Sequence, residues 1–133
     1  MIFVDTNVLV DVVTHHPVWS NWSLLQLEAA ALSDQLAINP VVYAELSIGF
    51  AEPAEVDVVL ARAEINIVEI PREALFLAGK VFHNYRRQGG TRTGVLPDFF
   101  IGAHAVVLGA PLITRDVGRY RTYFPALDLI TPE

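Results

Sequence analysis

Short, continuous apolar runs alternate along this chain with longer segments whose apolar residues recur at helical spacing. Such runs are typical of strands that are buried on both faces of a parallel sheet. We predict strands at 2–4, 36–39, 65–70, 111–114 and 127–130. Because strands and helices alternate, we expect a three-layer α/β/α domain of the Rossmann-like kind, with a central, mainly parallel sheet of four or five strands.

Prolines and small polar residues mark where the helices should begin, since proline fits the first helical turn and a polar side chain can cap it. Thr6 and Asn7 precede an apolar helix at 8–13. Further helices are predicted at 19–32, at 40–50, from 53 onward, at 71–87 and at 97–109.

Two of the predicted helices carry apolar residues that recur on one face. In the helix at 71–87 these are Ala74, Leu77, Ala78 and Val81. In the helix at 19–32 they are Trp22, Leu25, Ala29 and Leu32. The stretch around Trp19, Trp22, Leu24 and Leu25 could be divided between the core and a groove for a partner helix.

Composition limits the class of protein. The 133 residues suffice for a single domain, 1–133, and 53% of them are hydrophobic, with a mean hydropathy of +0.40, which excludes a disordered acidic tail. The chain has no cysteine, which excludes disulfides and thiolate metal sites. No apolar stretch is long enough to span a membrane and no signal peptide is recognisable, so we expect a cytoplasmic protein.

The net charge of −6 argues at first against a nucleic-acid partner. Four acids change this interpretation. Asp5 and Asp116 follow predicted strands, while Glu45 and Asp98 lie near the starts of predicted helices. Open α/β sheets bind ligands beyond the carboxyl ends of their strands, so all four could meet in one cavity. Clustered carboxylates favour Mg²⁺ or Mn²⁺, and such a cation would reverse the local charge so that a phosphate could approach.

Other interpretations of these acids are open. Taken singly, Asp98 could cap a helix and Asp116 could belong to a turn. A phosphatase of the haloacid-dehalogenase type would need an acid where the chain has Asn7. A response-regulator receiver would need an Asp after the middle strand, which ends in Glu69-Ile70-Pro71. A catalytically silent binding module on the same scaffold is a further alternative.

Four segments in this order resemble the PIN-domain ribonucleases, specifically the VapC-type toxins of bacterial toxin–antitoxin pairs. They are IFVDTN at 2–7, PVVYAEL at 40–46, LPDFFIGAHA at 96–105 and LITRD at 112–116. The resemblance implies an endoribonuclease that uses Mg²⁺ or Mn²⁺ to cut cellular RNA such as tRNA or rRNA. It implies metal-binding or water-positioning roles for Asp5, Glu45, Asp98 and Asp116, supported by Asn7 and Thr114. It also implies a VapB-type antitoxin as partner, and a homodimer or a larger assembly with that antitoxin.

Arginines lie on both sides of the last two acids. Arg86, Arg87 and Arg92 flank a glycine-rich loop at 89–94, and Arg115, Arg119 and Arg121 follow the fourth strand. We expect Arg86, Arg87, Arg92 and Arg115 to be candidates for RNA binding, although pairing with local acids is an equal alternative. His104 is expected to be a packing residue of its helix rather than a metal ligand.

Overall fold

The computed structural model describes residues 1–92 and 94–132, and within them five parallel strands form one sheet in the order β3-β2-β1-β4-β5. This confirms the parallel sheet and the α/β/α layering predicted from the sequence. The strands are β1 (Ile2–Val4), β2 (Leu36–Ile38), β3 (Ile65–Ile67), β4 (Leu112–Ile113) and β5 (Leu129–Ile130).

The central strands are buried over their whole length. β1, β2 and β4 are built of apolar residues that are all buried, as expected for strands covered on both faces. The edge strands are more exposed, and in β3 only Ile65 is buried. The third strand was predicted to reach residue 70, but it ends at Ile67. One further backbone bond, from Val68 to Ile38, closes the pairing before the next helix begins.

The helices mostly begin where the prolines predict. Their bounds are α1 (Thr6–Val13), α2 (Ser20–Ser33), α3 (Pro40–Ser47), α4 (Pro53–Arg62), α5 (Arg72–Arg87), α6 (Leu96–Leu108) and α7 (Val117–Tyr123). Gly109 ends α6 in the left-handed conformation, at φ 64°, that favours glycine after a helix. The sequence did not predict α7. Its residues include Arg119, Tyr120 and Arg121, and these give the segment no clear apolar face.

The buried face of α2 differs from the predicted one. Ser23, Leu27 and Ala30 are buried, whereas Leu25 is 61% and Leu32 is 91% exposed. The face shifts because Ser23 turns inward and donates a hydrogen bond to Asp11, itself buried in α1. The predicted face of α5 is correct, since Ala74 and Ala78 are completely buried.

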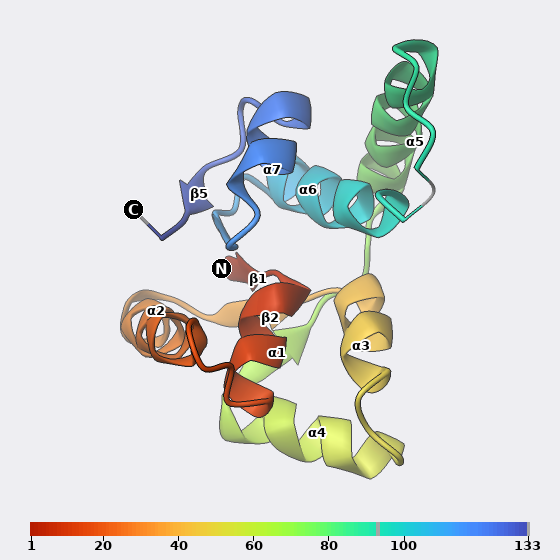
Figure 1. Cartoon of the computed structure of the whole chain (residues 1–133). Helices are drawn as coiled ribbons and strands as arrows, with labels where there is room; N and C mark the ends of the chain where they lie inside the picture. The colour runs from red at the N-terminus through yellow and green to blue at the C-terminus, as the bar shows by residue number, and fades with distance from the viewer. Residues whose placement is uncertain (93, 133) are drawn as a thin grey trace.

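Figure 1 shows α6 and α7 on one side of the sheet and α4 at the opposite end of the molecule, with α5 packed against α6 and extending away from the body. β1 lies in the middle of the sheet, next to both β2 and β4. Within the described ranges, no helix has both the length and the apolarity that crossing a membrane requires.

Gly102 allows α6 to pack closely against the end of α7. A Cβ atom at this position would lie 2.6 Å from Cδ2 and Cε2 of Phe124, whose ring is buried. We expect Gly102→Ala to lower the free energy of unfolding by about 1–3 kcal/mol, since the ring cannot move without disturbing the core. Urea denaturation measures the change.

The matched control is Gly79→Ala in α5, where an added Cβ would meet no atom within 4 Å. This change should stabilise the protein by about 0.5–1 kcal/mol, because alanine favours helix more than glycine does. If Gly102→Ala were as stable as the wild-type protein, the close contact between Gly102 and Phe124 would be refuted.

Candidate active site

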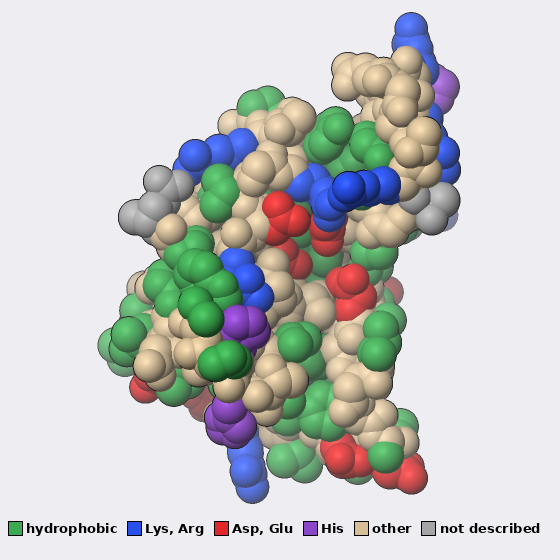
Figure 2. All heavy atoms as spheres, in the orientation of Figure 1, with side chains coloured by type: hydrophobic (Ala, Val, Ile, Leu, Met, Phe, Trp, Pro, Cys, Tyr) green, Lys and Arg blue, Asp and Glu red, His purple; other side chains and the backbone are tan. Residues whose placement is uncertain are grey.

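The four acids singled out in the sequence line one cavity of about 340 Å³ beyond the carboxyl ends of β1 and β4. β1 continues to β2 on one side and pairs with β4 on the other, so the cavity lies where the strand order reverses. Figure 2 shows acidic side chains gathered in the middle of this face, with basic side chains directly beside them. The acids are Asp5, Glu45, Asp98 and Asp116.

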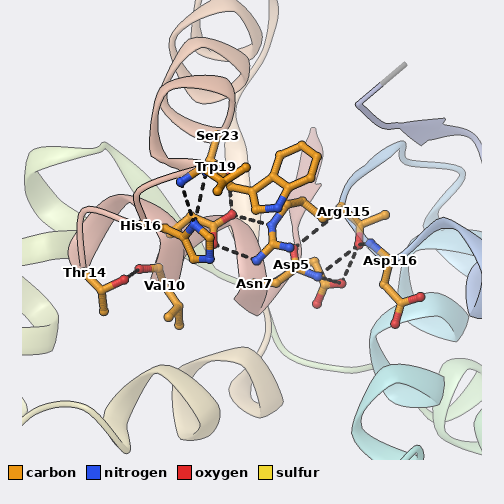
Figure 3. Close-up of polar contacts among 12 residues, drawn as sticks. Asp5, Asn7, Val10, Thr14, His16, Trp19, Ser23, Arg115 and Asp116 are labelled. Carbon is orange, nitrogen blue, oxygen red and sulfur yellow. Dashed lines mark hydrogen bonds and ion pairs between the residues drawn. The ribbon is translucent and has the colours of Figure 1, made fainter.

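Asp5 is the most buried of the four acids. It caps α1, and its Oδ1 accepts a hydrogen bond of 2.8 Å from the backbone N–H of Thr6. Its Oδ2 accepts a 2.7 Å bond from the Thr114 hydroxyl and a 3.3 Å bond from the Asn7 amide (Figure 3). These bonds hold the carboxylate in one orientation, and Oδ1 can still accept one more partner.

Burial makes a negative charge on Asp5 costly. The side chain is 4% exposed, and burial raises its pKa to about 7, while hydrogen bonding from Thr114 opposes the shift and the charge of Asp98 adds to it. Asp5 therefore titrates close to neutral pH in the absence of a cation.

Glu45 is positioned by Thr6 and by the capping of its own helix. The Thr6 hydroxyl donates a 2.6 Å hydrogen bond to Glu45 Oε1. At the start of α3, Asn39 Oδ1 accepts 3.0 Å bonds from the backbone N–H groups of Val41 and Val42. This leaves the Asn39 amide to face Nδ1 of His104 at 3.3 Å, which links α3 to α6.

His104 is buried and packs against Phe3, with ring centroids 4.6 Å apart. Burial lowers its pKa, so the ring is neutral at neutral pH. As predicted, His104 is one of the buried packing residues of α6, and it is not among the residues that line the acid cavity.

Asp98 and Asp116 share one arginine. Asp98 lies in the first turn of α6 and is paired through Oδ2 with Nη1 of Arg119. The same nitrogen is 3.7 Å from Oδ2 of Asp116, three residues before it in the chain. Burial raises the pKa of Asp98, and Arg119 opposes this shift, whereas the like charges of Glu45 and Asp116 reinforce it. The sequence drew attention to Arg119 only as one of several arginines.

Tyr120 lies directly beneath the acids. Its hydroxyl is buried and, in the described part of the chain, has no hydrogen-bond partner within bonding geometry. Burial raises its pKa well above 10, and the charge of Asp5 adds to the shift. Tyr120 is therefore a neutral phenol, and it lies close enough to Asp5 for each group to influence the pKa of the other.

Arg115 points away from the acid pair and binds Asp11 (Figure 3). Its Nε and Nη2 contact the two carboxylate oxygens of Asp11 at 2.6 and 2.8 Å, and its guanidinium lies 5.1 Å from the Trp19 ring centroid. Asp11 is 1% exposed and also accepts a bond from Ser23. The sequence missed this pair, although an acid inside the apolar segment at 8–13 was a signal of a buried ionic contact.

The other candidate arginines lie outside the cavity as the described residues define it. Arg86 and Arg87 are exposed at the end of α5, and the guanidinium of Arg86 stacks 5.1 Å from the Phe82 ring centroid. Arg92 is exposed, and its backbone N–H donates to the hydroxyl of Tyr85. Of the glycine-rich loop at 89–94, residue 93 lies outside the described residues.

The donors in this cavity are oxygens, the type that Mg²⁺ and Mn²⁺ prefer. The raised pKa values of Asp5 and Asp98 show that the site holds more negative charge than burial favours, which suits a cation. In the conformation described for residues 1–92 and 94–132, however, no three His, Asp or Glu side chains are arranged to hold a metal ion. The residue types that line the cavity nonetheless fit such an ion.

The PIN domain family model matches residues 2–125 of this chain. The fold is also that of VapBC2 from Rickettsia felis bound to a DNA fragment from their promoter, with a TM-score of 0.76, 23% identity and both chains covered at 100%. A toxin–antitoxin complex from Klebsiella pneumoniae has a TM-score of 0.70 and 24% identity, over 100% of this chain and 98% of that one.

VapBC-1 from nontypeable Haemophilus influenzae matches with a TM-score of 0.70 and 22% identity, over 98% of each chain. At these identities the structural likeness establishes the fold. A comparison with curated protein sequences found no significant match.

Proposed function

The chain belongs to the PIN domain family, and on this basis we propose that it is a metal-dependent endoribonuclease, the toxin of a toxin–antitoxin pair. The observation that carries the proposal is the convergence of four carboxylates from four separate segments on one cavity. The solved structures of the same fold, named as VapBC and toxin–antitoxin complexes, support the toxin role.

We assign the cation to oxygens of Asp5, Asp98 and Asp116, with Glu45 as a further ligand or as the group that orients a water. When bound there, Mg²⁺ or Mn²⁺ would supply a water of lowered pKa and would offset the negative charge of the phosphate. Cleavage of the phosphodiester then requires that the carboxylates keep their positions while the RNA backbone enters the cavity.

Neighbouring polar side chains fix the carboxylates for this task. Thr114 and Asn7 hold Asp5, and Thr6 holds Glu45. Groups that orient metal ligands in this way commonly contribute 10–100-fold to affinity or activity. The Thr114 hydroxyl also accepts a 3.0 Å bond from the backbone N–H of Asp116, so one hydroxyl aligns two of the acids.

RNA binding outside the cavity is assigned to exposed arginines at the end of α5 and in the loop that follows it. Arg86, Arg87 and Arg92 are exposed and can contact phosphates of a long substrate. Arg115 lines the cavity, but its guanidinium is already bound by Asp11. It would therefore contribute through its place beside the acids rather than through direct phosphate contacts. The proposed substrates are structured cellular RNAs such as tRNA or rRNA.

The proposed protein partner is a VapB-type antitoxin. Next to the acid cavity lies an apolar pocket of about 250 Å³ that shares Val10 and Glu45 with it and includes Leu46 and Phe50. A partner segment seated there would lie across the entrance to the acids. We also propose that the toxin forms a homodimer, alone or within the larger complex.

A catalytically silent module on the same scaffold is the second candidate. Two observations favour it: Arg119 pairs with Asp98, and no three acids or histidines among the described residues are arranged to hold a metal ion. The two candidates differ in what they predict for purified protein.

We expect the purified protein to cleave RNA when Mg²⁺ or Mn²⁺ is present and to lose this activity in EDTA, because hydrolysis depends on a cation held by the acids. Gel analysis of a tRNA and rRNA mixture, followed by sequencing of the new RNA ends, would measure cleavage and identify the site. Folded protein that leaves RNA intact at every metal concentration would favour the silent module.

The same experiment in cells separates the toxin role from the chemistry. Expression of the active protein should arrest growth, and co-expression of a small antitoxin encoded beside it should relieve the arrest. Normal growth in the presence of folded, active nuclease would refute the toxin role and leave the nuclease assignment in place.

A further inference from the structure

Arg119 sits between two of the acids that the proposed function assigns to a metal ion. Its Nη1 pairs with Oδ2 of Asp98 and lies 3.7 Å from Oδ2 of Asp116. The side chain comes from α7, one turn after Asp116, and is 24% exposed, so it has solvent on one side into which it can move.

The guanidinium meets a local excess of negative charge. Asp98 is 18% exposed and experiences the like charges of Glu45 and Asp116. A positive group placed against it compensates that repulsion, and it occupies Oδ2 of Asp98, an oxygen that another cation could otherwise use.

Arg119 and a divalent cation cannot occupy these oxygens together. Arg119 already holds Oδ2 of Asp98, and a cation bound by the same two carboxylates would lie close to the guanidinium, so the two positive charges would repel. The described residues show no three acids or histidines arranged around a metal, which agrees with a site in its arginine-paired form.

We propose that Arg119 is a built-in counter-ion that competes with the divalent metal for Asp98 and Asp116. It stabilises the acid cluster in the metal-free protein and has to leave these carboxylates before a metal ion can be bound. This inference rests on the proposed function, since it takes the acids to be metal ligands.

Arg115 cannot take over the part of Arg119. Its guanidinium makes a two-bond contact with Asp11 and packs against the Trp19 ring. The backbone N–H of Arg115 donates to Asn7 Oδ1 at 3.3 Å, which fixes its direction further. The competition is therefore a property of position 119 that can be tested by changing this residue.

The test is the affinity of the full chain for Mn²⁺, measured by titration calorimetry or from the electron paramagnetic resonance signal of free Mn²⁺, without any RNA. We expect Arg119→Gln to bind Mn²⁺ about fivefold more tightly than wild type, a factor appropriate to the loss of a partly exposed ion pair. In metal-free buffer the variant should unfold at lower urea, and saturating Mn²⁺ should remove that difference.

Two matched variants complete the design. Arg62→Gln removes the same charge from an exposed position on α4 and should leave the Mn²⁺ affinity unchanged. Arg119→Lys keeps the charge without the planar fork of donors and should shift the affinity in the same direction by a smaller factor.

Unchanged or weaker Mn²⁺ binding by Arg119→Gln would overturn the inference, because Arg119 would then leave the metal site unaffected or help to shape it. A wild-type protein and an Arg119→Gln variant that both fail to bind Mn²⁺ would instead contradict the proposed metal site itself.

Discussion

Asp98→Asn is expected to reduce metal-dependent RNA cleavage by at least about 100-fold while the protein stays folded. The reason is that Asp98 lines the cavity from the first turn of α6, and the variant would lose a charged carboxylate that the proposed function assigns to the metal ion. Loss of groups that only orient such ligands already costs 10–100-fold, so loss of a ligand should cost more. The amide has the size of the carboxylate, so the packing of α6 is kept.

Initial rates of cleavage at saturating Mn²⁺, together with circular dichroism, would measure this effect. The control is Asp128→Asn, which removes a carboxylate at an exposed position before β5 and should cleave at the wild-type rate. Wild-type cleavage by folded Asp98→Asn would show that the site assignment is wrong.

The second large effect is a loss of stability of the metal-free protein as the pH rises from about 4 to about 7. Burial raises the pKa of Asp5 to about 7 in the folded chain, against an ordinary pKa of 3.8 in the unfolded chain, so folding favours its protonated form. Below pH 3.8 the carboxyl is neutral in both states and no penalty exists. Between these two pKa values Asp5 is ionised in the unfolded chain but still protonated in the folded chain. The free energy of unfolding therefore falls by about 4 kcal/mol in total as the pH rises.

Urea denaturation in EDTA at several pH values, compared between wild type and Asp5→Asn, isolates this contribution. The variant has no proton to lose at position 5, so the wild-type protein should lose about 4 kcal/mol relative to it between pH 4 and pH 8. Added Mg²⁺ should restore wild-type stability at pH 8, since the cation binds the ionised carboxylate. Parallel stability curves for the two proteins would contradict the burial of a costly charge at Asp5.

The sequence was informative about the acids because their placement follows from local features. A buried strand that ends at Val4 puts Asp5 at the edge of the sheet, and a proline at the start of α6 puts Asp98 in its first turn. Parallel strands bring such positions to one edge whatever the detailed packing. The parallel sheet, the shared cavity and the approximate bounds of most helices were predictable from local features of the same kind, whereas the strand order was not predicted.

The partners of the charged side chains were not predictable, because they depend on contacts between distant segments. Arg115 and Asp11 are 104 residues apart in the sequence, and the same buried Asp11 accepts the hydrogen bond of Ser23 from the buried face of α2. Apolar periodicity contains no information about such a contact. The ion pair between Arg119 and Asp98 likewise requires α7, a helix that the apolar pattern did not reveal.

The position of β1 in the sheet has a consequence for the stage of protein synthesis at which the acid site can form. β1 leaves the ribosome first, yet its register with β4 pairs Phe3 with Leu112, and Asp5 is held by the hydroxyl of Thr114, 109 residues later. Contacts of such high sequence separation form late in folding, since a long loop must close before they stabilise the chain. A nascent chain that has not yet exposed β4 therefore cannot assemble the acid site, however early Asp5 itself is synthesised.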